Sequence, residues 1–400
     1  MEENKEEENL SKLEERLSSD LARITDPNNQ YIELYKRRLK DTTRKLAKAY
    51  DRIAVLEEAK DEIIGLQNEE VPLPNWTVNN KKEVESNNIP VILASDWHYG
   101  EDVNPKEVPN QNCFNSKVAN ERIQRLTENS INKIKAKGKR IKGVVVCFLG
   151  DDISGDIHDE LKESNSLTAL ESVILVAAQK TKMLLELQKE FKNVFVVSVP
   201  GNHGRNTLKM PSKNLVGHNY DTLVTMIVEA QLKNNPGIDF YTPKSGEAYF
   251  NINGVNFLAT HGDRIGSKGG QGFIGPSATI ARGQQKTRQA YAQIGKPIDW
   301  LLIGHFHTPM QLEHTIANGT LVGYNQYARD LRIEPDYPSQ TLFMIDDKYG
   351  VTDVSKIYVT NKELSVKDRE IYRKNSSNQS KNAIEKNKVM PEWIKRNSGR

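Results

Sequence analysis

Cysteine is scarce in this chain, which has only Cys113 and Cys147 among its 400 residues. The two are not spaced as a pair, which excludes a disulfide framework and a zinc site built from thiolates. Long apolar runs are missing too: no stretch approaches the roughly 18 apolar residues that a membrane helix needs. The acidic N-terminus also lacks the apolar segment of a signal peptide. These absences predict a protein of a reducing compartment, cytoplasmic and not bound to a membrane.

A strong net charge is also missing, because the formal charge at pH 7 is only +3. The average hides opposite ends. Residues 1–20 carry eight acidic and three basic side chains, whereas residues 356–400 carry twelve basic and five acidic ones. A globally basic nucleic-acid-binding protein is therefore not indicated, but the basic end is the part that a polyanion would meet. A pair of solvated tails is the alternative.

The first 69 residues predict a helical arm. From Ile32 to Ile63, the a and d positions of a heptad carry apolar or aromatic side chains, except for Thr42 and Lys60. This pattern predicts a coiled coil and, through it, a homo-oligomer; a long amphipathic helix packed on its own domain is the alternative. The remaining divisions are a linker at 70–88, one large α/β domain at 89–360 and a basic polar tail at 361–400.

The sequence pattern changes at residue 89, where short apolar runs begin to alternate with amphipathic segments. Runs such as VVVCFL are apolar on both faces, as strands are when both sides of their sheet are covered. The alternation of strands and helices predicts an α/β fold. We expect strands at 90–95, 143–149, 194–199, 249–252, 255–260 and 300–303, helices at 116–137, 167–191, 214–232 and 278–293, and further β structure at 311–316, 320–323, 341–345 and 354–359.

Side chains that can bind metals follow several of these strands, each just beyond the carboxyl end. In open α/β sheets, ligand sites form at that edge. Imidazoles combined with carboxylate and amide oxygens suit manganese, iron or zinc better than calcium. Seven candidates are more than one ion takes while keeping open positions, so two ions about 4 Å apart, bridged by a carboxylate, are the economical interpretation. The seven are Asp96, His98, Asp151, Asn202, His261, His305 and His307.

This series of motifs resembles the calcineurin-like metallophosphoesterase superfamily in type, order and approximate spacing, over roughly residues 89–325. The motifs are Asp96-x-His98, Gly150-Asp151, Gly201-Asn202-His203, His261 and Gly304-His305-x-His307. The resemblance implies a four-layer α/β/β/α sandwich with two metal ions, here with the helical arm in front of the catalytic domain.

The resemblance also implies a role for each position. One ion is held by Asp96, His98 and His307. The other is held by Asn202, His261 and His305, with Asp151 bridging the two. As a catalytic residue, His203 contacts the scissile phosphate or protonates the leaving oxygen.

One position departs from the superfamily pattern. An acidic residue commonly follows the Asn-His pair and supports the histidine, but here Gly204 and Arg205 follow. Either another group, such as Asp152, orients His203, or Arg205 has become a phosphate contact. His158, in SGDIHDE, is interpreted as a histidine of a surface loop.

The implied activity is hydrolysis of a phosphoester by hydroxide that two divalent ions generate, manganese being favoured over iron or zinc. A Gly-rich segment after His261 contains Arg264 and Lys268, which we expect to contact phosphate; a flexible lid or a structural turn is the alternative. With the basic residues of 278–293 and the basic end, they favour a nuclease acting on DNA or another polynucleotide, loosely similar to DNA-repair exonuclease-type members. A phosphomonoesterase of proteins or nucleotides and a non-catalytic coiled-coil scaffold are the alternatives.

Overall fold

The computed structural model describes residues 73–77, 88–137, 141–207, 214–265, 276–330 and 332–374. All of them belong to one unit of the chain, Val71–Arg400. The arm predicted at 1–69 lies outside the described residues, so the coiled coil and the homo-oligomer remain predictions. Within the described ranges, no helix combines the length and the apolar character that crossing a membrane requires.

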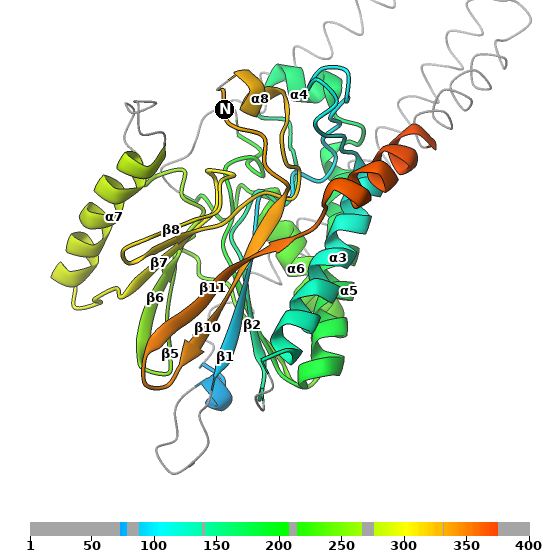
Figure 1. The fold of residues 1–400 in the computed structure, drawn as a ribbon. Coiled ribbons are helices and arrows are strands. Elements are labelled where there is room, and N and C mark those ends of the chain that lie inside the picture. Colours follow the sequence, from blue (N-terminus) through cyan, green and yellow to red (C-terminus); the bar gives the residue numbers. More distant parts are fainter. Residues whose placement is uncertain are drawn as a thin grey trace, which may run out of the picture. The chain divides into compact units, whose positions relative to one another are not determined.

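Two β-sheets form the centre of the fold (Figure 1). In the first, four neighbouring strands run parallel and β10 joins them in the antiparallel direction. Its order is β11 (Gly350–Tyr358), β10 (Ser339–Asp346), β1 (Ile89–Ala94), β2 (Val144–Phe148), β3 (Val194–Ser198) and β4 (Ile238–Tyr241). The order of the second sheet is β5 (Ala248–Ile252), β6 (Val255–Ala259), β7 (Trp300–Ile303), β9 (Thr315–Ala317) and β8 (Met310–Leu312).

Helices cover the outer faces of both sheets, as Figure 1 shows. On the six-stranded sheet lie α3 (Ser116–Lys135), α5 (Ala169–Phe191) and α6 (Tyr220–Leu232), and on the five-stranded sheet lies α7 (Pro276–Gln293). Two short helices, α4 (Asp159–Ser164) and α8 (Gln326–Asp330), stand near the edge where β1 ends, and η1 (Asn75–Thr77) precedes the first strand.

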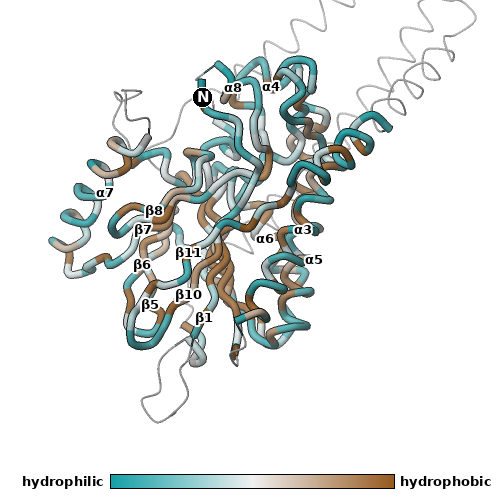
Figure 2. Tube along the Cα trace, in the orientation of Figure 1, coloured by the Kyte–Doolittle hydropathy of each residue, from teal (hydrophilic) through white to brown (hydrophobic). Residues whose placement is uncertain are grey.

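Strand residues of alternating position build separate cores, because successive side chains of a strand point to opposite faces. In β1, Ile92 joins the cluster against the helices, whereas Leu93 joins the cluster between the two sheets with Phe257. A third cluster, which includes Leu301 and Ile280, lies between β7 and α7. The buried strands are accordingly the most hydrophobic part of the trace in Figure 2. The predicted α/β fold is confirmed as a mixed α/β sandwich with two sheets.

Several predicted elements differ in detail. The helix expected at 214–232 begins only at Tyr220, because the side chain of Asn219 caps it by accepting from the Asp221 N–H. The strand expected at 311–316 is a hairpin of β8 and β9, because the backbone turns at His314 with a φ of 60°. Residues 320–323 are not a strand.

Two segments that the sequence assigns to the linker and the tail pack against the sandwich. Trp76 lies against the core between the sheets. Residues 362–374 form a helix whose Asp368 is buried. Asp368 pairs with Arg122 at 3.2 Å and with Arg125 at 2.8 Å, both on α3. The folded part of the chain therefore includes residues on both sides of the span 89–360.

Candidate metal centre

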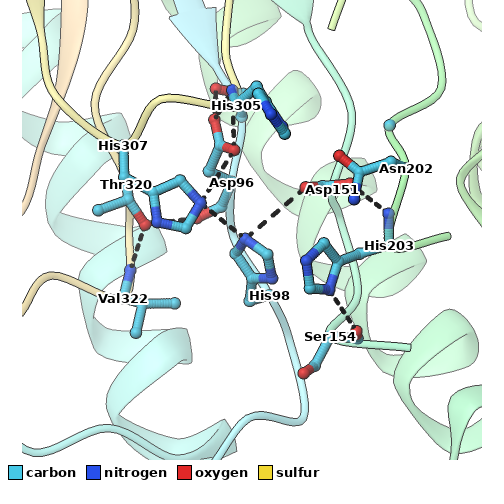
Figure 3. A network of polar contacts seen from close by, with 12 residues as sticks. Asp96, His98, Asp151, Ser154, Asn202, His203, His305, His307, Thr320 and Val322 are labelled. Atoms are coloured by element: carbon cyan, nitrogen blue, oxygen red, sulfur yellow. Dashed lines mark hydrogen bonds and ion pairs between the residues drawn. The ribbon is translucent and has the colours of Figure 1, made fainter. Parts of the chain in front are cut away.

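The seven candidate ligands lie together at one edge of the sandwich: Figure 3 labels six of them, and the seventh, His261, lies 3.0 Å from Asp151. Three parallel neighbours, β1, β2 and β3, end at this edge, as do β6 and β7 of the facing sheet. The turns after these strands supply all of the candidates, because carboxyl ends of parallel strands meet on one side of a sheet. In chain order the turns carry Asp96 and His98, Asp151, Asn202, His261, and His305 with His307.

Their donor atoms converge closely enough to share ions. Three groups each offer ligand atoms within 4.8 Å of one another: Asp96, His98 and His307; His98, Asp151 and His203; and Asp151, His261 and His305. Asn202 completes the third group, with its Oδ1 atom 3.1 Å from His261 Nε2. Asp151 belongs to two groups and lies between the others, as a bridging carboxylate must.

Five candidate ligands have a backbone conformation that only glycine adopts freely. Their φ angles are 53° for Asp96, 42° for His98, 54° for Asp151, 67° for His305 and 56° for His307. A left-handed conformation costs a residue other than glycine roughly 1–3 kcal/mol, and such residues cluster at functional sites.

Asp96 is fixed by a buried polar network that includes Gln340 of β10, the strand paired with β1. Its carboxylate accepts from the Ser95 hydroxyl and from the His305 N–H, the latter at 3.0 Å. The side chain of Asn318 donates to Ser95 Oγ at 2.9 Å, and Gln340 accepts from Asn318 and from the Ser95 N–H. Such outer partners orient ligands and set their affinity for metals.

Asp151 is held on all sides by neighbouring turns. Its Oδ2 atom lies 3.0 Å from His261 Nε2, and its Oδ1 atom accepts from the His203 N–H at 2.7 Å. His261 is itself oriented by the carbonyl of Leu149, which lies 2.7 Å from Nδ1 and leaves Nε2 for the centre. Gly201 makes this approach possible, because a Cβ there would lie 2.2 Å from Asp151 Oδ1.

The electrostatics of the metal-free centre differ from one candidate ligand to the next: they favour the metal-binding form of His98, His305 and Asp151, whereas nearby carboxylates raise the pKa of His261 and His307. Burial lowers the pKa of His98 well below its usual value, and the neighbouring imidazoles of His203 and His307 lower it further. Burial likewise lowers the pKa of His305 to about 4, with His261 adding to the effect. Burial alone would raise the pKa of Asp151, but the imidazoles of His261 and His203 hold it well below its ordinary range. Neutral imidazole and ionised carboxylate are the forms that bind metals.

His203 is not oriented by Asp152, the group suggested from the sequence. Its Nδ1 atom lies 2.8 Å from the carbonyl oxygen of Ser154 (Figure 3). Asp152 instead forms a buried ion pair with Lys180. Arg205 donates to the carbonyls of Asn202 and Thr207, at 3.1 and 3.3 Å. Gly204 has no room for an acidic side chain, because a Cβ there would lie 2.3 Å from Asn219 Oδ1.

A cleft of about 2160 Å³ opens over the candidate ligands. Arg205 and Arg264 are not among the described residues that line it, and Lys268 lies outside the described residues. His158, interpreted from the sequence as a surface-loop histidine, does line the cleft, and its ring centroid is 6.1 Å from that of His203. Besides Asp151, the carboxylates on its described wall are Glu101, Asp102, Glu107, Glu160, Asp330, Glu334 and Asp336.

Two residues near the centre escaped the sequence analysis. Glu101 lies on the cleft wall and accepts from Asn325 at 2.9 Å. Burial raises the pKa of Glu101, and the nearby imidazoles of His307 and His203 offset part of this rise. Asp221, in the first turn of α6, accepts from the backbone N–H of Asp151 at 2.9 Å. Neither belongs to a motif, and the only local signal for Asp221 is the Asn-x-Asp start of a helix.

No family model matches the chain, and no curated protein matches it. Among solved structures, the crystal structure of phosphopantetheinyl hydrolase from Mycobacterium tuberculosis is similar to it, with 13% sequence identity and a TM-score of 0.26. The match covers 60% of this chain and 92% of that chain. A likeness at this TM-score carries no argument about fold or activity, so the site rests on its own geometry.

Proposed function

We propose that the protein is a metal-dependent phosphoesterase of the calcineurin-like type that holds two divalent ions. The observation that carries the proposal is that close-lying ligand atoms and strained backbones occur together at one edge of the sandwich. Ligand atoms lie within 4.8 Å of one another in three overlapping groups, and five of the residues concerned have strained backbones. Such strain persists only where the surrounding structure imposes it, which supports a functional site over a chance cluster of polar residues.

The residues present fit the proposed ions. One position would be held by Asp96, His98 and His307, and the other by Asn202, His261 and His305, with Asp151 shared. Mixed imidazole and oxygen donors suit manganese, iron or zinc. His98 Nε2 and His307 Nε2 lie only 3.1 Å apart. At that distance the two nitrogen atoms either share a proton in a hydrogen bond or could both contact one cation.

When bound, two such ions polarise a phosphoryl oxygen and lower the pKa of a water molecule so that it attacks phosphorus. His203 would act on the opposite side of the reaction. Its Nδ1–H donates to Ser154 O, which leaves Nε2 as the ring nitrogen that faces the reaction. In the imidazolium form of the ring, Nε2–H would donate to a phosphoryl oxygen or give its proton to the leaving oxygen, and the ring would return to the neutral Nδ1–H form. The Ser154 carbonyl therefore fixes both the tautomer and the direction of the ring.

The cleft favours a substrate with one phosphoryl group over a polynucleotide. Seven carboxylates besides Asp151 stand on its described wall, whereas Arg332 is the single Lys or Arg among the described lining residues. Two of the seven, Asp330 and Asp336, are paired with Arg329 and Lys356, which leaves five against one. A polynucleotide is bound mainly by cationic side chains along its backbone. We therefore propose a small organic phosphoester, mono- or diester, as the substrate. A nuclease activity on DNA is the second candidate, and it is supported by the basic residues of 356–400.

The proposal is tested with purified protein stripped of metal. We expect hydrolysis of p-nitrophenyl phosphate or bis(p-nitrophenyl) phosphate after Mn²⁺ is added, and none in its absence. Asp151→Ala should abolish the activity, and the surface variant Asp353→Asn should retain it. A protein that binds no divalent ions would contradict the proposal and favour a scaffold, whereas turnover of oligonucleotides alone would favour the nuclease.

A further inference from the structure

We propose that Asp221 is a positioning residue of the metal centre: it holds the two turns that carry Asp151 and Asn202 at a fixed separation. This inference rests on the proposed function, because it deepens the account of the same site. Asp221 lies in the first turn of α6 and is buried.

The carboxylate of Asp221 accepts three backbone hydrogen bonds from two different turns. Its Oδ2 atom accepts from the N–H of Asp151 at 2.9 Å and from the N–H of Gly201 at 2.9 Å. Its Oδ1 atom accepts from the N–H of Asp152 at 3.2 Å. One side chain thus connects the turn after β2 with the turn after β3, through groups 70 and 20 positions away in the chain.

The residues just before Asp221 hold the second of these turns from its other side. Asn219 Nδ2 donates to the carbonyl of Gly201 at 2.6 Å, while Asn219 Oδ1 caps α6 by accepting from the Asp221 N–H. The Tyr220 N–H donates to the carbonyl of Gly204 at 2.6 Å. The turn that carries Asn202 is therefore bonded to the start of α6 at both of its ends.

Both side-chain oxygens of Asp221 are used as acceptors, because all three of its partners are N–H donors. An asparagine would offer one acceptor oxygen and would turn its NH₂ group toward one of the N–H groups. Buried N–H groups left without an acceptor shift to find one. Since Asp151 and Gly201 move with these N–H groups, we expect Asp151 and the neighbouring Asn202 to lose their mutual alignment.

The test compares Asp221→Asn with the wild type by calorimetric titration of the metal-free protein with Mn²⁺ alone. Loss of an outer partner of a metal site commonly weakens metal binding 10- to 100-fold, and we expect a loss in that range. The matched control is Asp368→Asn, which also removes a buried carboxylate, but one that pairs with Arg122 and Arg125 and accepts no backbone N–H of a candidate ligand. It should lower thermal stability and leave Mn²⁺ affinity within twofold of the wild type.

Folding is checked for every variant by circular dichroism and thermal unfolding in EDTA. A folded Asp221→Asn protein with wild-type Mn²⁺ affinity would overturn the proposal, as would an equal loss of affinity in Asp368→Asn. If Asp221→Asn does not fold, Asn219→Ser decides, because serine keeps a cap oxygen but loses the donor to Gly201. We expect a severalfold weaker affinity for it, and an unchanged affinity contradicts the inference.

The outcome is separable from that of the proposed function. A wild type that binds Mn²⁺ and hydrolyses no phosphoester would refute the phosphoesterase, while the comparison of Mn²⁺ affinities would still judge Asp221. A wild type that binds no Mn²⁺ would refute both.

Discussion

The Nε2 atoms of His98 and His307 lie 3.1 Å apart, although 209 positions separate these residues in the chain. Both residues have a left-handed backbone conformation, with φ angles of 42° for His98 and 56° for His307. Burial lowers the pKa of His98 well below its usual value, which keeps that ring neutral at pH 7. Asp96 raises the pKa of His307, so in the metal-free protein a proton on His307 can bridge the pair, and a bound cation would take the place of that proton.

The first prediction concerns the number of bound ions. Asp151→Asn should reduce the content from about two ions per chain to one or none, because the bridging carboxylate is shared by both positions. Elemental analysis after loading with Mn²⁺ and gel filtration measures this directly. The control Asp353→Asn, on the exposed face of β11, should keep two ions. Two tightly held ions in Asp151→Asn would show that this carboxylate is not a ligand.

The second prediction concerns His203. His203→Asn should lower kcat by about 10²- to 10⁴-fold for an alkyl phosphoester, whose leaving oxygen needs a proton, and by much less for a p-nitrophenyl ester. The control His314→Asn changes a histidine that bonds to the carbonyl of Asp299, outside the centre. Its kcat should match the wild type. If His203→Asn loses an ion instead, His203 is a ligand, as its place near His98 and Asp151 would then explain.

The positions of the candidate ligands could be predicted from the sequence, because apolar runs mark the strands and the motifs stand directly after them. The supports of these residues could not. The group that orients His203 is the backbone carbonyl of Ser154, and every residue type has one. Asp221 reaches Asp151 across 70 positions, a contact that exists only once β2, β3 and α6 have packed.

The lining of the cleft is the part of the site that the sequence predicts least well. The phosphate contacts predicted at Arg205 and Arg264, which follow candidate ligands closely in the chain, stay predictions, and neither residue is among the described lining residues. A cleft wall, however, is assembled from distant segments, and the described wall includes residues of α4 and the segment around α8. Sequence proximity to a ligand is a weak guide to such a surface, because a turn can direct successive side chains to opposite sides. For the same reason His158 was not recognised as a cleft residue.

The third prediction concerns the buried ion pair beside the centre. Lys180→Met should destabilise the protein by about 3–5 kcal/mol, because it leaves the Asp152 carboxylate buried without its partner. Urea unfolding in EDTA measures the free energy of unfolding. Lys182→Met, at an exposed position of the same helix, is the control and should change it little. The double variant Lys180→Met with Asp152→Asn should recover part of the loss; no recovery would argue against the pair as the cause.

The fourth prediction is a pH dependence of the metal-free protein. Burial, together with the carboxylates of Asp152 and Asp151, raises the pKa of Asp221 to about 7. In the unfolded chain an aspartate has a pKa of about 3.9. The folded state therefore binds an extra proton between these values, so this stabilising contribution is complete below pH 4 and is lost as the pH rises through 7.

Asp221→Asn cannot bind that proton. The free energy of unfolding of the wild type in EDTA should therefore fall more steeply from pH 4.5 to 7 than that of the variant, by at most about 1.4 kcal/mol per pH unit. Urea unfolding at intervals of half a pH unit gives both slopes. Parallel slopes would mean that Asp221 is ionised throughout this range.

The last prediction concerns the acidic wall of the cleft. Glu160 and Glu334 are exposed lining residues, and the double variant Glu160→Gln with Glu334→Gln removes two negative charges without touching the ligands. If the wall repels polyanions, this variant should bind a single-stranded oligonucleotide more tightly than the wild type, and the difference should shrink between 50 and 200 mM salt because salt screens the repulsion. The kcat/KM for a small phosphoester should change less.

Glu363→Gln, an exposed glutamate outside the cleft lining, is the control for charge alone. Tight oligonucleotide binding by the wild type, falling about 10³- to 10⁵-fold over the same salt range, would instead indicate six to ten phosphate contacts and favour the nuclease.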